Sequence, residues 1–343
     1  MSGDNDLDEY IVKDLENELA VPGSNGRVKV VALADRAPNP TWSETLLFEV
    51  LPGLKATPIQ ALANWGERNL GDPRTLLEFV TWARKNHPAE HYALYFWGHG
   101  WNWHPGYIME DSSSQDALDP HELQAILPQL GMWDVVGYDG CNMASIEVEA
   151  LWQGFAKTLV HSQEFVDWDG LEYDRILKVL NAKPQIQAEE MAILSALSAS
   201  YNQERTGSAV VLDERFEALM KAVDQWSIAL MSGLPKYKTE ILWALKQAQH
   251  FEEAEDEKDL IHLAQLFKLN LPDAKIRETS AQVEATAQAS LLHAWHRFDY
   301  PEANGISISV LAPDNPDRVD YLQSVFAQRT HWDEFLKVLW HVR

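Results

Sequence analysis

Short apolar runs alternate with stretches of helical spacing along the first two thirds of the chain. The apolar runs are rich in β-branched and aromatic residues and lie at 28–33, 92–97, 135–138, 158–161 and 209–212. Between them, 72–85 and 119–127 have helical spacing. The second opens with Asp119, Pro120 and Glu122, which fit a capping box with proline in the first turn. This alternation predicts parallel βαβ units and therefore an α/β fold with a mostly parallel sheet.

The last third of the chain has a different pattern. Residues 235–300 are almost wholly helical in spacing, as in the segment 284–295, and predict a helical addition. An apolar run at 305–311 predicts one more strand, which we expect to return to the same sheet. The segments 318–326 and 331–340 predict closing helices.

No internal repeat, low-complexity tract or long linker marks a domain boundary. The chain has 343 residues, of which 46% are hydrophobic, and this is enough to bury a large core. We expect one compact domain made of a core at 1–234, the helical addition at 235–300, and a strand and helices at 301–343 that return to the core.

Acidic residues outnumber basic ones. The chain has 52 Asp and Glu against 28 Lys and Arg, and its net charge of -24 repels nucleic-acid phosphate and anionic lipid but attracts basic peptides. The chain has no apolar run of membrane-spanning length, and its first residues lack the basic start and apolar stretch of a signal peptide. We therefore expect a cytoplasmic protein with no nucleic-acid or membrane partner.

The single cysteine, Cys141, limits the possible chemistry. One cysteine excludes an intramolecular disulfide and a zinc site with several thiolates. Three interpretations remain, namely a buried packing residue, a surface residue or a nucleophile.

Two predicted strands end in reactive side chains. The strand at 92–97 leads into His99, which lies between two glycines, and the strand at 135–138 leads through Asp139 and Gly140 into Cys141. Ligands of parallel α/β sheets bind beyond the carboxyl ends of the strands, so neighbouring strands would bring His99 and Cys141 to one edge. A thiol that cleaves peptides needs a nearby base to protonate the leaving amine, and His99 is the best-placed candidate.

Two further expectations concern the surroundings of the sulfur. The segment 142–150 has the pattern of a helix, so Cys141 would lie near a helix N-terminus, which favours the thiolate. His104 and His161 also lie near the predicted edge. Neither follows a strand directly between two glycines, and both are weaker candidates than His99.

Four segments together resemble the successive signatures of the clostripain-like cysteine peptidases. They are Asp-Asn-Asp-Leu-Asp-Glu-Tyr at 4–10, His-Pro-Ala-Glu-His-Tyr-Ala-Leu-Tyr-Phe-Trp-Gly-His-Gly at 87–100, Val-Gly-Tyr-Asp-Gly-Cys-Asn-Met-Ala-Ser at 136–145 and Ala-Asn-Gly-Ile-Ser-Ile-Ser at 303–309. The segments around His99 and Cys141 are the specific ones. The resemblance implies a caspase-like sandwich of helices on a mostly parallel sheet, and a His-Cys dyad without a third acidic member.

The resemblance also implies roles for particular residues. His99 would be the general base and Cys141 the nucleophile, and the backbone N–H groups of Gly100 and Cys141 would hold the oxyanion. Asp139 and Asp169 match the acidic pocket that reads Arg or Lys at P1, the residue before the cleaved bond. A buried guanidinium requires such a carboxylate partner. The alternatives are a strand-end turn residue for Asp139 and an ordinary Asp-Gly turn for Asp169.

The chain departs from the family pattern in three places. Relatives usually carry a hydrophobic strand before the 4–10 segment, so that strand is either absent or stands in an upstream extension that could hold an export signal. The glycine-rich turn after the histidine is replaced by the bulkier segment 101–104. Some relatives depend on calcium, but without an EF-hand loop we expect no cofactor or metal. Asp4, Asp6, Asp8 and Glu9 are then expected to form a solvated turn and helix start.

The resulting hypothesis is a cysteine endopeptidase that cleaves after Arg or Lys. One alternative is a caspase-fold peptidase with another P1 preference, gated by an activating or inhibitory protein in a bacterial defence or death pathway. Another is an inactive scaffold. Many relatives mature by cutting themselves after a basic residue between the histidine and cysteine strands, whereas here no Lys or Arg lies between Lys85 and Lys157. We therefore expect a single-chain enzyme.

Overall fold

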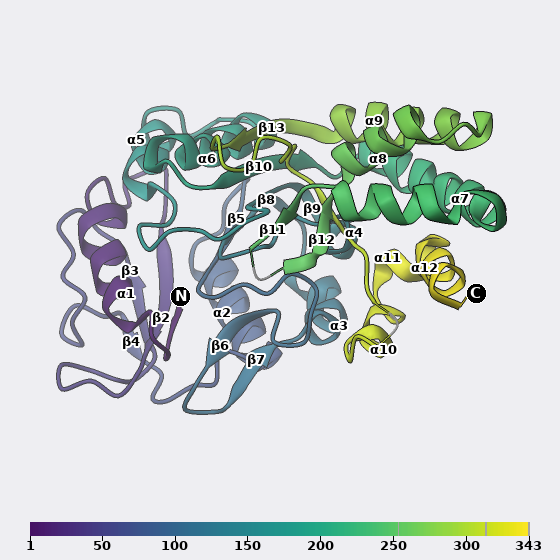
Figure 1. Ribbon diagram of the computed structural model, residues 1–343. Coiled ribbons are helices and arrows are strands. Elements are labelled where there is room, and N and C mark those ends of the chain that lie inside the picture. Colours follow the sequence, from purple (N-terminus) through teal and green to yellow (C-terminus); the bar gives the residue numbers. More distant parts are fainter. Residues whose placement is uncertain (253, 313, 342–343) are drawn as a thin grey trace.

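A five-stranded sheet forms the centre of the computed structural model, which describes residues 1–252, 254–312 and 314–341 (Figure 1). Its strand order is β13-β10-β9-β8-β5. The neighbours β5, β8 and β9 are parallel, whereas β10 is antiparallel to both β9 and β13. This confirms the expected α/β class with a mostly parallel sheet. The strands are β5 (Ala93–Trp97), β8 (Trp133–Asp139), β9 (Ala156–His161), β10 (Thr206–Val211) and β13 (Leu291–His296).

Side chains of the central strands alternate between two cores, one on each face of the sheet. Leu94 and Val136 belong to the larger core, and Trp97 and Val135 to the smaller one. This alternation follows from the two-residue period of a strand. The larger core includes side chains of α2 (Pro73–Asn86), α3 (Pro120–Leu130), α4 (Ile146–Trp152) and α7 (Glu214–Gln247). The smaller core includes side chains of α1 (Asp8–Asp14), α5 (Tyr173–Ala182) and α6 (Ala188–Asn202).

A second sheet packs on the smaller core. Its strand order is β1-β2-β3-β4, and β1 is parallel to β2 with Gly3 opposite Arg36. The first residues of the chain are thus held by strand pairing. The strands are β1 (Ser2–Gly3), β2 (Val31–Arg36), β3 (Leu46–Glu49) and β4 (Ala63–Asn64), and the π-helix η1 (Leu15–Leu19) follows α1. A separate hairpin consists of β6 (Ile108–Asp111) and β7 (Asp116–Leu118).

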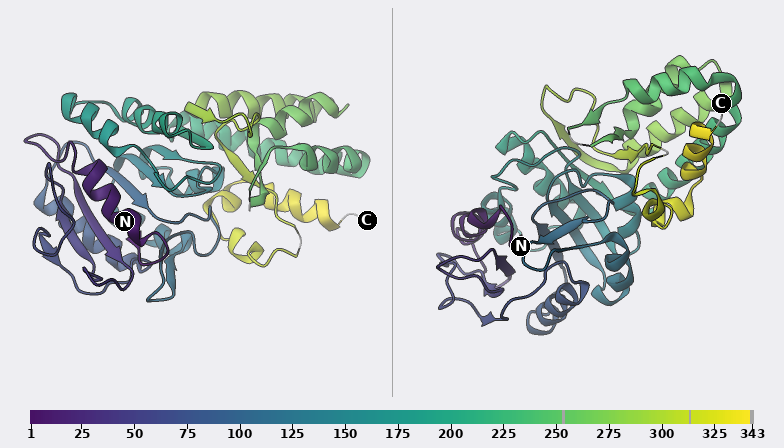
Figure 2. Two further views of the ribbon diagram at one scale, coloured as in Figure 1. Left: turned by 60° about the vertical axis from the view of Figure 1, so that its left-hand side comes forward. Right: turned by 60° about the horizontal axis from the view of Figure 1, so that its bottom comes forward.

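Helices dominate the end of the molecule opposite the second sheet. Figure 2 shows the green helices at one end and the purple N-terminal elements at the other. The helices after α7 are α8 (Leu260–Asn270), α9 (Ala274–Ser290), α10 (Arg318–Tyr321), α11 (Val325–Arg329) and α12 (Trp332–His341). A three-stranded sheet lies among them, with β11 (His250–Phe251), β12 (Ala254–Asp259) and β14 (Ser307–Ser309). In the described part of the chain, no helix combines the length and apolar character needed to cross a membrane.

The strands and helices expected before residue 235 are confirmed, with shifted ends. β5, β8, β9 and β10 overlap the predicted strands, and β2 begins at Val31 rather than at residue 28. α2 and α3 match the predicted helices, and the capping box of Asp119 and Glu122 is present. Local signals therefore located these elements correctly.

Three expectations for the last third are wrong. The segment 235–300 contains β11, β12 and β13 in addition to its helices, and residues 291–295 form a strand rather than the end of a helix. The strand β14 pairs with β12 and not with the central sheet. It is β13 that joins the central sheet, where Thr206 of β10 lies opposite His296. Whether these segments become strands, and which sheet they join, depends on hydrogen bonds to strands far away in the sequence. The local pattern of apolar and polar residues carries no information about those partners.

Candidate active site

The register of β5 and β8 brings His99 and Cys141 to the same edge of the sheet. Trp97 lies opposite Asp139 in this parallel pair, and His99 and Cys141 each follow two residues later. The Gly98 N–H donates a hydrogen bond to the Asp139 carbonyl over 3.2 Å, so the pairing continues past the strand ends. The ends of β5 and β8 therefore lie side by side, as expected from the sequence.

The backbones beyond the two strands approach each other closely at Gly100. A Cβ atom on Gly100 would lie 2.5 Å from the Cys141 carbonyl oxygen and 2.9 Å from the Met143 side chain. Because the first of these contacts is to backbone, a larger residue would displace the Cys141 segment. Glycine at this position therefore allows the histidine loop to pack directly on the cysteine loop.

His99 has an acidic partner that the sequence did not predict. Its Nε2 atom lies 2.6 Å from Oδ1 of Asp6, in the segment between β1 and α1. The imidazole is 39% exposed. When Nε2 donates to Asp6, Nδ1 carries the lone pair that can accept a proton. Asp6 appeared in the sequence only as one of several clustered acids, and the contact depends on the placement of β1.

The thiol of Cys141 is half buried and surrounded by negative charge. Its Sγ atom lies 4.0 Å from the carbonyl oxygen of Val166. Burial and, after it, the nearby carboxylates of Glu164, Glu204 and Asp139 together raise the pKa of Cys141 to about 11. Both causes disfavour the thiolate. With this pKa, the Cys141 thiol is protonated at neutral pH.

The expectation that a helix N-terminus supports the sulfur is wrong. Helix α4 begins at Ile146, where the Ser145 hydroxyl caps it by accepting a hydrogen bond from the Val148 N–H. Asn142 has a φ of 56°, in the left-handed region, so the chain turns directly after Cys141. A serine cap four residues after the cysteine, followed by a helical pattern, is a signal that could have placed the helix correctly.

Asp139 is a buried acid that holds the loop after β9. Its carboxylate accepts hydrogen bonds from the Leu171 N–H at 3.1 Å and from the Tyr173 hydroxyl at 2.7 Å. Burial raises the pKa of Asp139 to about 6. A Cβ atom on Gly170 would lie 2.8 Å from this carboxylate, and Gly170 has a φ of 58°, so the loop needs glycine here.

Asp169 lies at the surface of the same loop. Its side chain is 68% exposed and forms an ion pair with Lys13 of α1. Beside this pair, Trp168 stacks on Tyr10 with ring centroids 5.0 Å apart. The loop that lies near the sulfur is thus attached to α1 by two contacts, and the Asp169 carboxylate faces Lys13.

Glu204 is a second buried acid near the sulfur that the sequence did not reveal. It is 2% exposed, and its Oε2 atom accepts a hydrogen bond from the Asp167 N–H at 2.6 Å. Within the described residues its Oε1 atom is buried and has no hydrogen-bond partner. Burial raises the pKa of Glu204 to about 8. Glu204 follows α6, far from Cys141 in sequence, so only the tertiary structure shows this proximity.

The two weaker histidine candidates have other contacts. His104 pairs through Nδ1 with Asp317 at 2.7 Å and stacks on Trp103. His161 is buried, where its Nδ1 atom lies 2.9 Å from the Ser208 hydroxyl. Burial lowers the pKa of His161 to about 3, so this imidazole is neutral. The segment 101–104 thus contributes to packing against the C-terminal region.

Solved structures share this fold over nearly the whole chain. One is a secreted C11 cysteine protease from Bacteroides thetaiotaomicron in complex with an irreversible peptide inhibitor. It has a TM-score of 0.74 and 16% identity, and the match covers 97% of this chain and 98% of that chain. Another is an inactive zymogen C11 protease from Parabacteroides distasonis, with a TM-score of 0.72, 17% identity and coverage of 96% and 95%. The fold is therefore that of the C11 cysteine proteases, a caspase-like sandwich of helices on a sheet.

Sequence comparison identifies the family to which the chain belongs. The model of the clostripain family matches residues 1–340. The clostripain of Hathewaya histolytica is 23% identical over 252 residues, which is 62% of this chain. This chain spans about half of that protein, 48% of its length. The chain belongs to the clostripain family, which confirms the resemblance. The cytoplasmic location expected from the first residues stays a prediction, since the Bacteroides protease is described as secreted.

The raised pKa of the thiol generates a first prediction. Cys141 is the only cysteine, so alkylation by iodoacetamide can be followed by intact mass. We expect the alkylation rate to keep rising between about pH 8 and pH 10, because the thiolate is the reactive form. Glu204→Gln should shift this profile to lower pH, whereas Glu214→Gln at an exposed position of α7 should not. A wild-type rate that levels off below about pH 7 would show that the thiolate is already formed.

Proposed function

We propose that the chain is a cysteine endopeptidase in which His99 and Cys141 form the catalytic dyad. The observation that carries this proposal is the register of β5 and β8, which aligns the two residues beyond the paired Trp97 and Asp139. The close contact at Gly100 adds support, because it joins the two loops. Membership of the clostripain family agrees with this chemistry.

The proposed reaction is acyl transfer through a thioester. His99 removes the proton from the Cys141 thiol, and the sulfur attacks the peptide carbonyl. The backbone N–H groups of Gly100 and Cys141 stabilise the oxyanion, and the imidazolium then protonates the leaving amine. Water hydrolyses the thioester and restores the thiol. Asp6 accepts a hydrogen bond from Nε2 and thereby orients the imidazole.

We infer a preference for Arg or Lys at P1 from the charge around the sulfur. Asp139 and Glu204 are buried carboxylates that act electrostatically on Cys141, and Asp169 in turn acts on Glu204. A basic side chain beside them would find carboxylate partners and would offset their repulsion of the thiolate. Asp169 serves at the mouth of this pocket, where the substrate competes with Lys13. The net charge of -24 favours the approach of basic peptides.

The dyad is tested by two substitutions and a matched control. We expect Cys141→Ala and His99→Ala each to lower kcat by at least about a hundredfold without changing the melting temperature strongly, because each removes a reacting group. His104→Ala should keep most of the activity, since His104 contacts Asp317 and Trp103 instead. Retention of more than about a tenth of wild-type activity by either dyad variant would refute the assignment.

The preference for basic residues is tested with peptide reporters that differ only at P1. Arg and Lys reporters should be cleaved much faster than Asp or Leu reporters. Glu204→Gln should lower kcat/KM for the Arg reporter by about a hundredfold, because the loss of one partner leaves a buried charge unpaired. The exposed Asp169 should matter less, with a loss of about tenfold in Asp169→Asn because solvent screens it.

The control for these reporters is Asp174→Asn, whose carboxylate pairs with Lys178 along α5. It should leave the ratio between the Arg and Leu reporters unchanged. Equal cleavage of the Asp and Arg reporters by the wild type would overturn the proposed pocket.

The absence of basic residues between Lys85 and Lys157 predicts an enzyme that stays in one piece. An enzyme specific for Arg and Lys finds no bond to cut between the histidine and cysteine strands. After incubation, the wild type and Cys141→Ala should therefore show the same intact mass and the same N-terminus. A cut between residues 100 and 134 in the wild type alone would contradict either the single chain or the P1 preference.

A further inference from the structure

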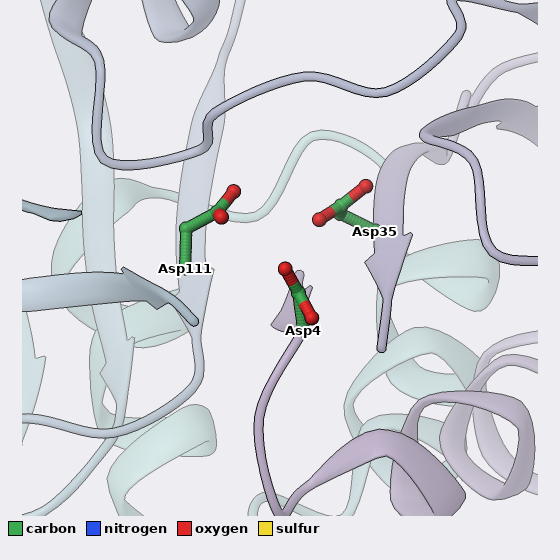
Figure 3. Close-up of side chains that lie close together, drawn as sticks. All are labelled: Asp4, Asp35 and Asp111. Atoms are coloured by element: carbon green, nitrogen blue, oxygen red, sulfur yellow. The ribbon is translucent and has the colours of Figure 1, made fainter. Parts of the chain in front are cut away.

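The first residues of the chain support the histidine loop from one side. A Cβ atom on Gly98 would lie 3.2 Å from the Ser2 carbonyl oxygen, so β1 packs directly against this loop. After β1, the Asp4 carboxylate lies close to those of Asp35 and Asp111 (Figure 3), with one oxygen of each within 4.8 Å of the others. All three residues are at most 1% exposed. The expectation that Asp4 belongs to a solvated turn is therefore wrong, because the pairing of β1 with β2 carries it into the interior.

Three of the four residues that replace the glycine-rich turn are held against the protein by their side chains. Asn102 is buried, and its Oδ1 atom accepts the Ser145 hydroxyl at 2.5 Å. Trp103 is also buried, and its indole N–H donates to the Ser309 hydroxyl at 2.5 Å. His104 stacks on Trp103 with ring centroids 4.2 Å apart. The turn is thus fixed to the start of α4 and to β14.

The fourth residue of this turn, Trp101, has its backbone fixed and its side chain in solvent. Its N–H donates to the Tyr107 carbonyl at 3.0 Å, and its carbonyl accepts the His104 N–H at 3.2 Å. Asn102 has a φ of 53°, so the chain turns directly after Trp101. The indole is nevertheless 45% exposed. A rigid turn therefore presents a large apolar side chain at the surface, where it is available for contact with a ligand.

Trp101 lies on the same side of the loop as His99. The chain is extended around Gly100, which forms an antiparallel bridge with Ile108. Side chains two residues apart in an extended segment point in the same direction. The indole of Trp101 therefore lies beside the partly exposed imidazole of His99, at the edge of the candidate active site.

The proposed mechanism assigns the two sides of the site to different parts of the substrate. The His99 imidazolium protonates the leaving amine, which belongs to P1′, the residue after the cleaved bond. The P1′ residue therefore lies beside the histidine loop, next to the indole of Trp101. The P1 side chain is directed instead toward the buried carboxylates near Cys141. This placement of P1′ rests on the proposed peptidase function.

We propose that Trp101 determines which residue is accepted at P1′ and binds a large apolar side chain there, such as Leu or Phe. A tryptophan presents a broad, rigid apolar surface, and its contact with such a side chain removes both from water. The carboxylate of Asp6, which is 70% exposed beside His99, would repel Asp or Glu at P1′. A glycine-rich turn would offer no such surface. The preference therefore comes from the segment in which this chain departs from the family pattern.

Binding is measured first on the full chain with Cys141→Ala, which cannot cleave, so this test does not depend on catalysis. The probes are peptides with Arg at P1 that differ only at P1′, where they carry Leu, Phe, Ser, Arg or Asp. The Leu and Phe peptides should bind about tenfold more tightly than the Ser peptide, and the Asp peptide most weakly. Adding Trp101→Ala should reduce the difference between Leu and Ser to about twofold. Trp101→Phe should keep most of it, because an aromatic face remains.

The matched control is Trp243→Ala on α7, since this tryptophan is also 45% exposed. It should leave the ratio between the Leu and Ser peptides unchanged, both in binding and in kcat/KM measured with Cys141 intact. The expected binding pattern without any cleavage by the wild type would refute the peptidase function and still support the P1′ site. An equal ratio with and without the Trp101 indole, or no binding of any peptide, would overturn the proposal. Tightest binding of the Arg peptide would overturn the choice of an apolar side chain.

Discussion

The parallel register of β5 and β8 is the constraint on which the candidate site depends. It sets Trp97 opposite Asp139, and the next two residues of each strand then align His99 with Cys141. A slip of one residue would send the side chains of a strand to the opposite face and separate this pair. Large apolar side chains on both faces of the sheet fix the register, because any slip would move Leu94 and Trp97 out of their cores.

The same register sets the electrostatics around the sulfur. Asp139 ends β8 with its side chain buried, where it holds the loop that contains Gly170. This loop brings Val166 to the sulfur, and Glu204 in turn holds Asp167. Carboxylates that hold the surrounding loops thus lie near the thiol. They raise its pKa and so favour its protonated form, and a positive charge nearby would offset this effect. The cost to the thiolate and the proposed preference for a basic substrate would then have one physical origin.

The features that could be predicted from sequence are those encoded locally. Apolar runs ending in Gly-His-Gly and Asp-Gly-Cys located both strand ends, and the capping box at Asp119 located α3. Contacts between distant segments were not accessible in this way. The pairing of β1 with β2 buries Asp4, and the turn after α6 brings Glu204 toward Cys141. The strand β13 forms from a helical pattern because β10 offers it an edge.

The N-terminal segment connects the buried carboxylates of Asp4, Asp35 and Asp111 to the candidate active site through a continuous series of contacts. Ser2 donates to the carbonyl of Glu110, Asp4 accepts from Ser113, and Asp6 reaches His99. Because these contacts lie within five consecutive residues, a shift of Asp4 displaces Asp6 as well. Repulsion among Asp4, Asp35 and Asp111 acts directly on this segment, because the three carboxylates are buried close together. The position of the His99 imidazole therefore depends on how Asp4, Asp35 and Asp111 are held in the interior.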